Sequence, residues 1–340
     1  MRGLINYVYQ LVGPRIFSVK YEDAVCSGKV MIRPKYMAIC HADQRYYLGK
    51  RSADVLNKKL PMALIHECCG EVVLDESGNF KVGQKVVMIP NVVGTKKDGI
   101  YENYLKDSAF LSSGKDGFMR EFVILDHDRV VTFTGIKEQV ACISEFISVG
   151  VHAVNRFIKC SHNYKKTFGV WGDGSLSYTV CNILRNKFPN SRIFVIGKSP
   201  MKLSLFSFVD ETYLVDELPQ DFEIDHAFEC VGGGGSSFAI DDIIKYINPQ
   251  GTVMLMGVSE SLVPIKTRDI LEKGLTFIGS SRSGREDFEG AVKLLQEKNF
   301  RSRFEPILYE DKAVCNVDDI HRVFNNDLNT PFKTVFEWRI

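Results

Sequence analysis

The chain has 340 residues, and its 43 basic and 42 acidic residues give a formal net charge of +1. This length predicts two domains, each with a core large enough to fold without disulfides. No block of like charge favours nucleic acid or a membrane surface, and no run has the length of a membrane span or the pattern of a signal peptide. The nine cysteines lack the spacing of a secreted disulfide scaffold, which favours a reducing cytoplasm.

The first part of the chain is rich in short β patterns. Residues 7–131 form apolar runs broken by Gly, Pro, Asn and Asp, and the clearest strands are predicted at 29–34, 70–74 and 84–90. The polar segment 91–117 is predicted to be a long loop, and loops of this length usually serve a function or move. We therefore predict an irregular, mostly β domain.

The pattern changes near residue 137. A helix over 138–158 is predicted to lead into a segment in which strands and helices alternate, which indicates a doubly wound parallel sheet of the α/β class. After it, a helix over 286–296 precedes a tail with short β runs, which we expect to return to the first domain. The predicted strands are 167–171, 192–197, 211–215, 226–231, 251–257 and 275–279, with helices at 176–186, 200–208 and 240–247.

A glycine-rich turn follows the first strand of this α/β segment. Gly172 permits a tight turn, and Gly174 lets a pyrophosphate approach the N–H groups where the next helix begins, at Ser175 and Leu176. Ser177 is small enough to replace the third glycine of the dinucleotide fingerprint. A strand, turn and helix with no ligand is the alternative, but the alternating sheet favours a cofactor site.

The second strand of the segment leads into Lys198 and Ser199, without the acid that accepts a ribose 2′-hydroxyl. A lysine beside a serine suits a 2′-phosphate, so the sequence favours NADPH over NADH. The alternative is that Lys198 is an ordinary solvated loop lysine.

Four residues of the first part could bind a metal. Cys40, His66, Glu67 and Glu145 provide a thiolate, an imidazole and two carboxylates, which suits a catalytic zinc with an open position. Their long spacing requires the fold to bring them together. Taken singly, Cys40 is better explained as a core cysteine and Glu145 as a surface acid.

These motifs resemble those of the zinc-dependent medium-chain dehydrogenases of the alcohol and polyol dehydrogenase type. The resemblance covers the whole chain and rests on the segments 39–43, 65–72, 145–153 and 229–233 together with the glycine turn. It implies a GroES-like, mostly β catalytic domain at 1–150 and 283–340 and an NADP-binding Rossmann domain at 151–282. It also implies that Cys40 and His66 bind zinc, that Glu67 and Glu145 are alternative or additional ligands, that Asp43 orients His66, and that Gly232 contacts the cofactor.

Within that family, segments 8–15 and 40–51 are most similar to the ribulose-5-phosphate reductases, which make ribitol 5-phosphate for bacterial teichoic acid and capsule synthesis. The resemblance implies ribulose 5-phosphate as substrate and a cytidylyltransferase as a partner. The substrate phosphate needs cationic and hydroxyl donors near the zinc cysteine. The candidates are Arg45, Tyr46, Tyr47, Lys50 and Arg51, with solvated loop charges as the alternative.

The chain departs from its relatives in two places. Ala42 stands where many relatives have the hydroxyl of a proton relay, and Arg45 stands where some have its histidine. We therefore expect a water near Glu67 or a tyrosine to deliver the proton. Segment 91–117 contains no cysteine, whereas many relatives bind a structural zinc there with four. The resemblance therefore implies one catalytic zinc and no structural zinc.

We expect NADPH at the carboxyl ends of the sheet strands, zinc as a Lewis acid on the substrate carbonyl, and hydride transfer to C2. One alternative is a polyol or alcohol dehydrogenase that uses NAD and an unphosphorylated substrate. Another is a non-catalytic relative that serves as a binding subunit. A homodimer is also expected, with 252–258 and 275–280 as the sheet edge available for pairing.

Overall fold

The computed structural model describes residues 4–340, which divide into two compact units. The first unit comprises the described part of Met1–Ser148 together with Ser283–Ile340, and the second is Val149–Arg282. Within residues 4–340, no helix is both long enough and apolar enough to cross a membrane.

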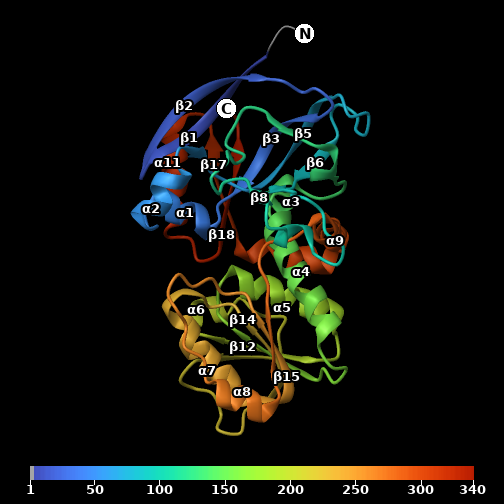
Figure 1. Cartoon of the computed structure of the whole chain (residues 1–340), viewed down its shortest axis with the longest axis vertical. Helices are drawn as coiled ribbons and strands as arrows, with labels where there is room; N and C mark the ends of the chain where they lie inside the picture. Colours follow the sequence, from blue (N-terminus) through green and yellow to red (C-terminus); the bar gives the residue numbers. More distant parts are fainter. Residues whose placement is uncertain (1–3) are drawn as a thin grey trace. The chain divides into compact units, whose positions relative to one another are not determined.

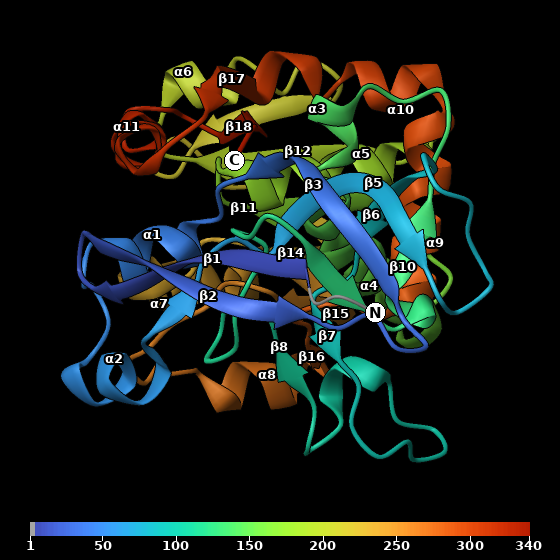
Figure 2. The same cartoon turned by 90° about the horizontal axis from the view of Figure 1, so that it is seen from above.

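The first unit is built around the long strand β3 (Val30–Ala38), which pairs antiparallel with β5 (Glu67–Asp75) and with β18 (Lys333–Trp338) (Figure 1). The tail thus returns to the first part of the chain, as predicted. In Figure 2, β3 and β5 lie side by side along their length. The other strands of this sheet are β6 (Lys85–Met88), β9 (Val123–Leu125), β10 (Val130–Thr132) and β17 (Leu308–Val314); a second sheet contains β1 (Leu4–Gly13), β2 (Ile16–Ala24) and β4 (Met62–Ala63).

The tail also contains α11 (Val317–Asp327), where the sequence analysis predicted only β runs. Ile320, Val323 and Phe324 are buried at helical spacing, and Asn316 Oδ1 caps the helix by accepting from Asp319 N at 3.0 Å. The other helices of this unit are α1 (His41–Tyr47), α2 (Ala53–Lys59), α3 (Glu138–Ala141), α9 (Arg285–Gln296) and α10 (Lys298–Ser302).

The second unit is a six-stranded parallel sheet in the order β13-β12-β11-β14-β15-β16, which confirms the predicted doubly wound fold. The chain reverses its direction of winding between β12 and β14, on either side of β11. In sheets of this kind, ligands bind at that switch point, beyond the carboxyl ends of the strands. The strands are β11 (Thr167–Trp171), β12 (Arg192–Gly197), β13 (Glu211–Leu214), β14 (Ile224–Glu229), β15 (Ile247–Leu255) and β16 (Thr276–Gly279).

Helices cover both faces of this sheet, because alternate side chains of each strand point to opposite faces. Phe168 packs edge-on against Phe157 of α4 (Ser144–Cys160), with ring centroids 5.6 Å apart. Trp171 belongs instead to a core with residues of α7 (Ser236–Tyr246). The remaining helices are α5 (Ser175–Lys187), α6 (Pro200–Leu203) and α8 (Thr267–Lys273).

Helix α6 ends at Leu203, whereas the sequence predicted a helix to residue 208. Phe206 and Phe208 each contact Tyr178, with ring centroids 5.0 Å apart. Residues two apart do not share one face of a helix, so both contacts require a non-helical backbone here. Likewise, the helix predicted over 138–158 is divided into α3 and α4.

His226 of β14 is a buried histidine that we expect to make the stability of the protein depend on pH. It is fully buried, its Nδ1 accepts from Thr252 N at 3.1 Å, and its Nε2 lies 3.0 Å from Tyr164 O. Burial, together with His162, lowers the pKa of His226 from 6.5 to about 4. The folded state binds this proton more weakly than the unfolded state does. The contribution of neutral His226 to the unfolding free energy is therefore complete above pH 6.5 and is lost as the pH falls toward 4.

We predict that His226→Asn, which keeps an acceptor for Thr252 N–H, flattens this dependence. The wild type should lose up to about 3 kcal/mol of unfolding free energy between pH 6.5 and 4 through this residue. Urea denaturation at both pH values measures the difference between wild type and variant. If wild type and variant lose the same unfolding free energy between pH 6.5 and 4, His226 is not the residue responsible.

Candidate metal centre and dinucleotide cavity

In the first unit, three strands bring residues from distant parts of the chain together. Cys40 follows β3 and precedes α1, while Glu67 begins β5 directly opposite Ala38 of β3. Lys333 begins β18, and Thr334 O accepts from Ile39 N at 3.0 Å. The pairing of β3 with both neighbours therefore fixes the surroundings of Cys40.

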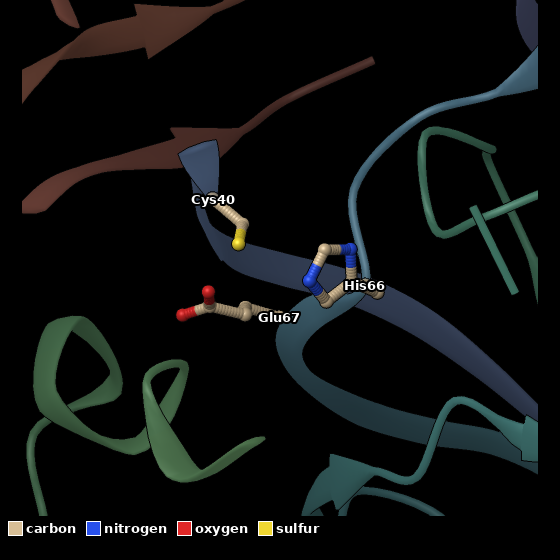
Figure 3. Close-up of side chains that lie close together, drawn as sticks. All are labelled: Cys40, His66 and Glu67. Carbon is tan, nitrogen blue, oxygen red and sulfur yellow. The ribbon is translucent and has the colours of Figure 1, made fainter. Parts of the chain in front are cut away.

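Cys40, His66 and Glu67 form a group that could hold a metal ion. Their ligand atoms, a sulfur, a ring nitrogen and a carboxylate oxygen, all lie within 4.8 Å of one another. Figure 3 shows the three side chains pointing toward a common space. His66 and Glu67 are buried, and Cys40 is half-buried. The structure therefore brings together three of the four residues that the sequence analysis proposed as ligands.

Asp43 anchors this group. Its Oδ1 accepts from Ile65 N at 3.0 Å and from Ser112 Oγ at 2.7 Å, and its Oδ2 lies 3.5 Å from His66 Nδ1. Burial alone would raise the pKa of Asp43, but the His66 ring and the hydrogen bonds hold it below its usual value. Asp43 thus lies where a carboxylate can orient the imidazole, as the resemblance implied.

The surroundings of His66 favour positive charge. Burial alone would lower the pKa of His66, but Asp43 and Cys40 raise it well above its usual value. Ile65 has a φ of +67°, which is strained for a β-branched residue and marks a special backbone position next to His66. Oε2 of Glu67 is buried and has no hydrogen-bond partner among the described residues. A divalent cation fits the donor set of Cys40, His66 and Glu67, because it would balance the negative charge of the thiolate and the carboxylate and would bind Glu67 Oε2.

Lys333 is a member of the site that the sequence analysis missed. Its ammonium group forms a buried ion pair with Glu67 Oε1, donates to Ile39 O at 3.1 Å and lies 4.8 Å from the centre of the Phe146 ring. Burial alone would lower the pKa of Lys333, but Glu67 and Cys40 raise it. One oxygen of Glu67 is therefore held by Lys333, and the other is available.

Glu145, at the start of α4, does not belong to the three-residue group. It is buried, and burial raises its pKa to about 7, with Glu67 adding to the effect and His66 opposing it. A carboxyl group in this environment is poised to change its protonation state. The geometry favours Glu67 over Glu145 as the first carboxylate ligand.

Helix α1 carries most of the residues predicted to bind phosphate, and they fall into two sets. Tyr46 and Tyr47 are buried, and Tyr47 Oη lies 3.0 Å from His321 Nδ1. Arg45 is half-buried, Lys50 is exposed, and the Arg51 guanidinium lies 5.0 Å from the centre of the Tyr46 ring. The cations are thus more accessible than the tyrosine rings.

Hydrogen bonds to two carboxylates, Asp107 and Glu102, hold the segment 91–117 in place. This segment contains no cysteine. Thr95 Oγ1 donates to Asp107 at 2.7 Å, and Thr95 N donates to the same carboxylate. Glu102 accepts from Arg129 at 2.7 Å and from Arg285 N at 2.8 Å. The segment contains β7 (Asn91–Val92), a short 3₁₀ turn (Glu102–Tyr104) and β8 (Ala109–Phe110), so it is more ordered than the predicted loop.

In the second unit, a cavity of about 810 Å³ lies at the switch point of the sheet. Its lining includes Gly172, Gly174 and Lys198, which the sequence analysis assigned to the cofactor. Ser175 and Leu176 begin α5 beside this lining, and Ser199 follows Lys198. The rest of the lining is Trp171, Asp173, Ile196, Gly197, Val215, Asp216, Cys230, Val231, Gly235, Phe238, Ala239, Asp241 and Asp242.

Two carboxylates shape the loops around this cavity. Asp173 Oδ2 accepts from the N–H groups of Lys198 and Ser199, both at 2.7 Å. The buried carboxylate of Glu229 accepts from Gly232 N and from Gly257 N, both at 3.0 Å. Gly232, which the resemblance implicated in cofactor binding, is therefore fixed between two adjacent loops and has a φ of +68°.

Comparison with known families defines the class of this protein. Residues 26–135 match the alcohol dehydrogenase GroES-like domain, and residues 193–297 match the zinc-binding dehydrogenase domain. The first contains Cys40, His66 and Glu67, and the second covers much of the parallel sheet. The chain is thus a zinc-binding dehydrogenase with a GroES-like domain and a Rossmann-type domain, and the predicted fold class is confirmed.

Individual relatives narrow the class further. The chain is 53% identical to the ribulose-5-phosphate reductase of Streptococcus pneumoniae over 340 residues, 99% of this chain and 98% of that protein. It is 49% identical to ribulose-5-phosphate reductase 1 of Staphylococcus aureus, over 98% and 99% of the two chains. The crystal structure of S. aureus TarJ in complex with NADPH matches with a TM-score of 0.88 and 44% identity, over 99% and 100% of the chains. The chain belongs to the ribulose-5-phosphate reductase family.

Proposed function

We propose that this protein reduces D-ribulose 5-phosphate to D-ribitol 5-phosphate with NADPH. The hydride adds to the C2 carbonyl carbon, a proton adds to the carbonyl oxygen, and NADP⁺ leaves. The group of Cys40, His66 and Glu67 carries this proposal, because it supplies a metal-binding donor set within a chain 53% identical to a reductase of that name. The first unit would provide the catalytic site and the second the NADP site.

In this proposal, Cys40, His66 and Glu67 hold one zinc ion, and Glu145 is an alternative or additional ligand. When bound, the zinc supplies Lewis-acid stabilisation of the negative charge that develops on the substrate oxygen. Asp43 holds the His66 ring in place, and Lys333 holds Glu67. A water near Glu67 or a tyrosine is proposed to deliver the proton.

The cofactor proposal rests on the cavity of the second unit. The N–H groups at the start of α5 can bind the pyrophosphate, and Lys198 with Ser199 can bind the 2′-phosphate. Because the structure of S. aureus TarJ contains NADPH, the same cofactor is proposed here. The test is an assay of ribulose 5-phosphate with NADPH and NADH in parallel. A higher kcat/KM with NADH would contradict the cofactor assignment.

Arg45 is proposed to bind the substrate phosphate, which predicts a selective effect of Arg45→Ala. The KM for ribulose 5-phosphate should rise about tenfold or more, because a charge-assisted hydrogen bond is lost, while the KM for unphosphorylated D-ribulose should change little. Lys58→Ala removes an exposed cation of α2 and is the matched control. Equal small effects on both substrates would refute the role of Arg45.

The main alternative is a polyol or alcohol dehydrogenase acting on an unphosphorylated substrate. NADPH oxidation with ribulose 5-phosphate, D-ribulose, xylulose and fructose separates the two. A non-catalytic binding subunit would show no turnover with any of them. Preference for an unphosphorylated sugar would favour the alternative, whereas a large preference for ribulose 5-phosphate supports the proposal.

We also propose the cytoplasm as the compartment, since all nine cysteines are free thiols. The product fits a role in teichoic acid or capsule synthesis, with a cytidylyltransferase as a partner that consumes it.

A homodimer is proposed through the sheet edge at β16; Leu262 and Leu271, which precede this strand in the chain, are 100% and 80% exposed. Light scattering of the protein alone and mixed with that enzyme tests both associations.

A further inference from the structure

The cavity of the second unit has a chemically divided lining. The glycine turn contributes backbone N–H groups, and Lys198 contributes a cation, both suited to phosphate. Four aspartates also line the cavity: the Asp173 carboxylate accepts from Lys198 N and Ser199 N, and Asp216, Asp241 and Asp242 contribute three further carboxyl groups. Phosphate groups are repelled by this acidic part, so it must face a different portion of the ligand, one that donates hydrogen bonds.

Two of these acids, Asp241 and Asp242, belong to α7, and Trp171 lines the same cavity. Gly169 has no side chain, and the Trp171 ring packs over that position, so close that a Cβ there would lie 2.4 Å from the indole. The ring thereby lies along the sheet, in one core with Ala239 of α7. Asp242, three residues further along the helix, lines the cavity together with Trp171.

The indole N–H of Trp171 is a donor that can fix the orientation of the Asp242 carboxylate. Trp171 is 1% exposed, and its Nε1 has no hydrogen-bond partner among the described residues. Buried N–H donors are rarely left in this state. The nearby Asp242 carboxylate is an acceptor that can take the indole N–H with one oxygen and leave its other oxygen for a ligand.

The three acids differ in their availability. Asp241 forms an ion pair with Lys266 at 3.3 Å, and Asp216 is exposed to solvent. Asp242 is half-buried, and burial, with a contribution from Asp241, raises its pKa. A partly desolvated carboxylate gains most from a donor that the ligand brings, so Asp242 is the specific acceptor.

Apolar side chains form the remaining lining of the cavity near Asp242. Ile196, Val215, Val231 and Ala239 provide surfaces for a flat ring, next to the acceptor. Adenine combines such a ring with a 6-amino donor on its edge. We propose that Asp242 accepts a hydrogen bond from the adenine 6-amino group of the dinucleotide and thereby selects adenine over hypoxanthine. This inference rests on the proposed function, since it concerns the NADPH of the same reaction.

The test compares NADPH with its deamino form, in which hypoxanthine replaces adenine. Hypoxanthine presents an oxygen at position 6, which would face the Asp242 carboxylate as a second acceptor. Isothermal titration calorimetry of the zinc-loaded, full-length protein without sugar substrate gives both dissociation constants. We expect the wild type to bind NADPH about ten- to hundredfold more tightly than deamino-NADPH.

Asp242→Asn should reverse part of this preference, because its amide can donate to the oxygen of hypoxanthine. NADPH should bind about tenfold more weakly than to wild type, and deamino-NADPH as tightly as before or more tightly. Asp241→Asn removes the same charge from the adjacent position and should keep the wild-type ratio. Thermal unfolding of each variant establishes that the unit is folded.

Three results would overturn the inference. One is a wild type that binds both cofactors equally. Another is an Asp242→Asn variant that loses the same affinity for both, because Asp242 would then contact a ribose hydroxyl and not the base. The third is a wild type that binds neither, and that result alone would also contradict the proposed function.

Discussion

Cys40→Ala should remove the metal and almost all of the activity. The zinc content is expected to fall from one ion per chain to a small fraction, because the variant loses the thiolate of a three-residue donor group. The value of kcat/KM for ribulose 5-phosphate should fall at least about a thousandfold, since Lewis-acid catalysis supplies several kcal/mol and each 1.36 kcal/mol is a factor of ten. Mass spectrometry of the metal content and steady-state kinetics provide the two measurements.

Cys315→Ala is the matched control, because Cys315 is an exposed thiol of the same unit. It should keep one zinc per chain and full activity. Two zinc ions in the wild type would contradict the proposal that the cysteine-free segment 91–117 binds none. An active, zinc-loaded Cys40→Ala protein would contradict the proposed ligand set.

Lys333→Met should strongly destabilise the metal-free protein. Lys333 is 4% exposed and Glu67 is fully buried, so removal of the ammonium group leaves a buried carboxylate without its cation. Breaking a buried ion pair on one side costs about 3–5 kcal/mol. Zinc should restore more stability to this variant than to the wild type, because a divalent cation also neutralises Glu67. Urea denaturation with and without zinc measures both effects.

The double variant Glu67→Gln/Lys333→Met removes both charges and provides the comparison. In the absence of metal it should recover much of the stability that Lys333→Met alone loses, although its activity should be low. If Lys333→Met without metal unfolds at the wild-type urea concentration, the ion pair has no structural role and the account of Lys333 is wrong.

The sequence predicted those parts of the site that depend on local pattern. The thiol, imidazole and carboxylates near Cys40 and His66 follow motifs, and the glycine turn follows from its place between a strand and a helix. Lys333 was missed because its partner Glu67 is 266 residues away, and the two meet only because β3 pairs with both β5 and β18. A lysine within the predicted β run Phe332-Lys333-Thr334-Val335-Phe336 was the available signal.

The fold shows the same division between local and distant causes. The strand predicted at 192–197 has the observed bounds of β12, since an apolar run of that length is sufficient to specify a buried strand. Helix α11 was missed although Ile320, Val323 and Phe324 have helical spacing, because the tail was judged by its β runs alone. The end of α6 depends on contacts with Tyr178 of α5, which local pattern does not contain.

The central claim is the reduction of ribulose 5-phosphate by NADPH, and its direct test is a product balance. Zinc-loaded protein is incubated with both compounds while NADPH absorbance and the ³¹P NMR spectrum are followed. One ribitol 5-phosphate should form for each NADPH oxidised. No product from ribulose 5-phosphate, alongside turnover of unphosphorylated D-ribulose under the same conditions, would contradict the account.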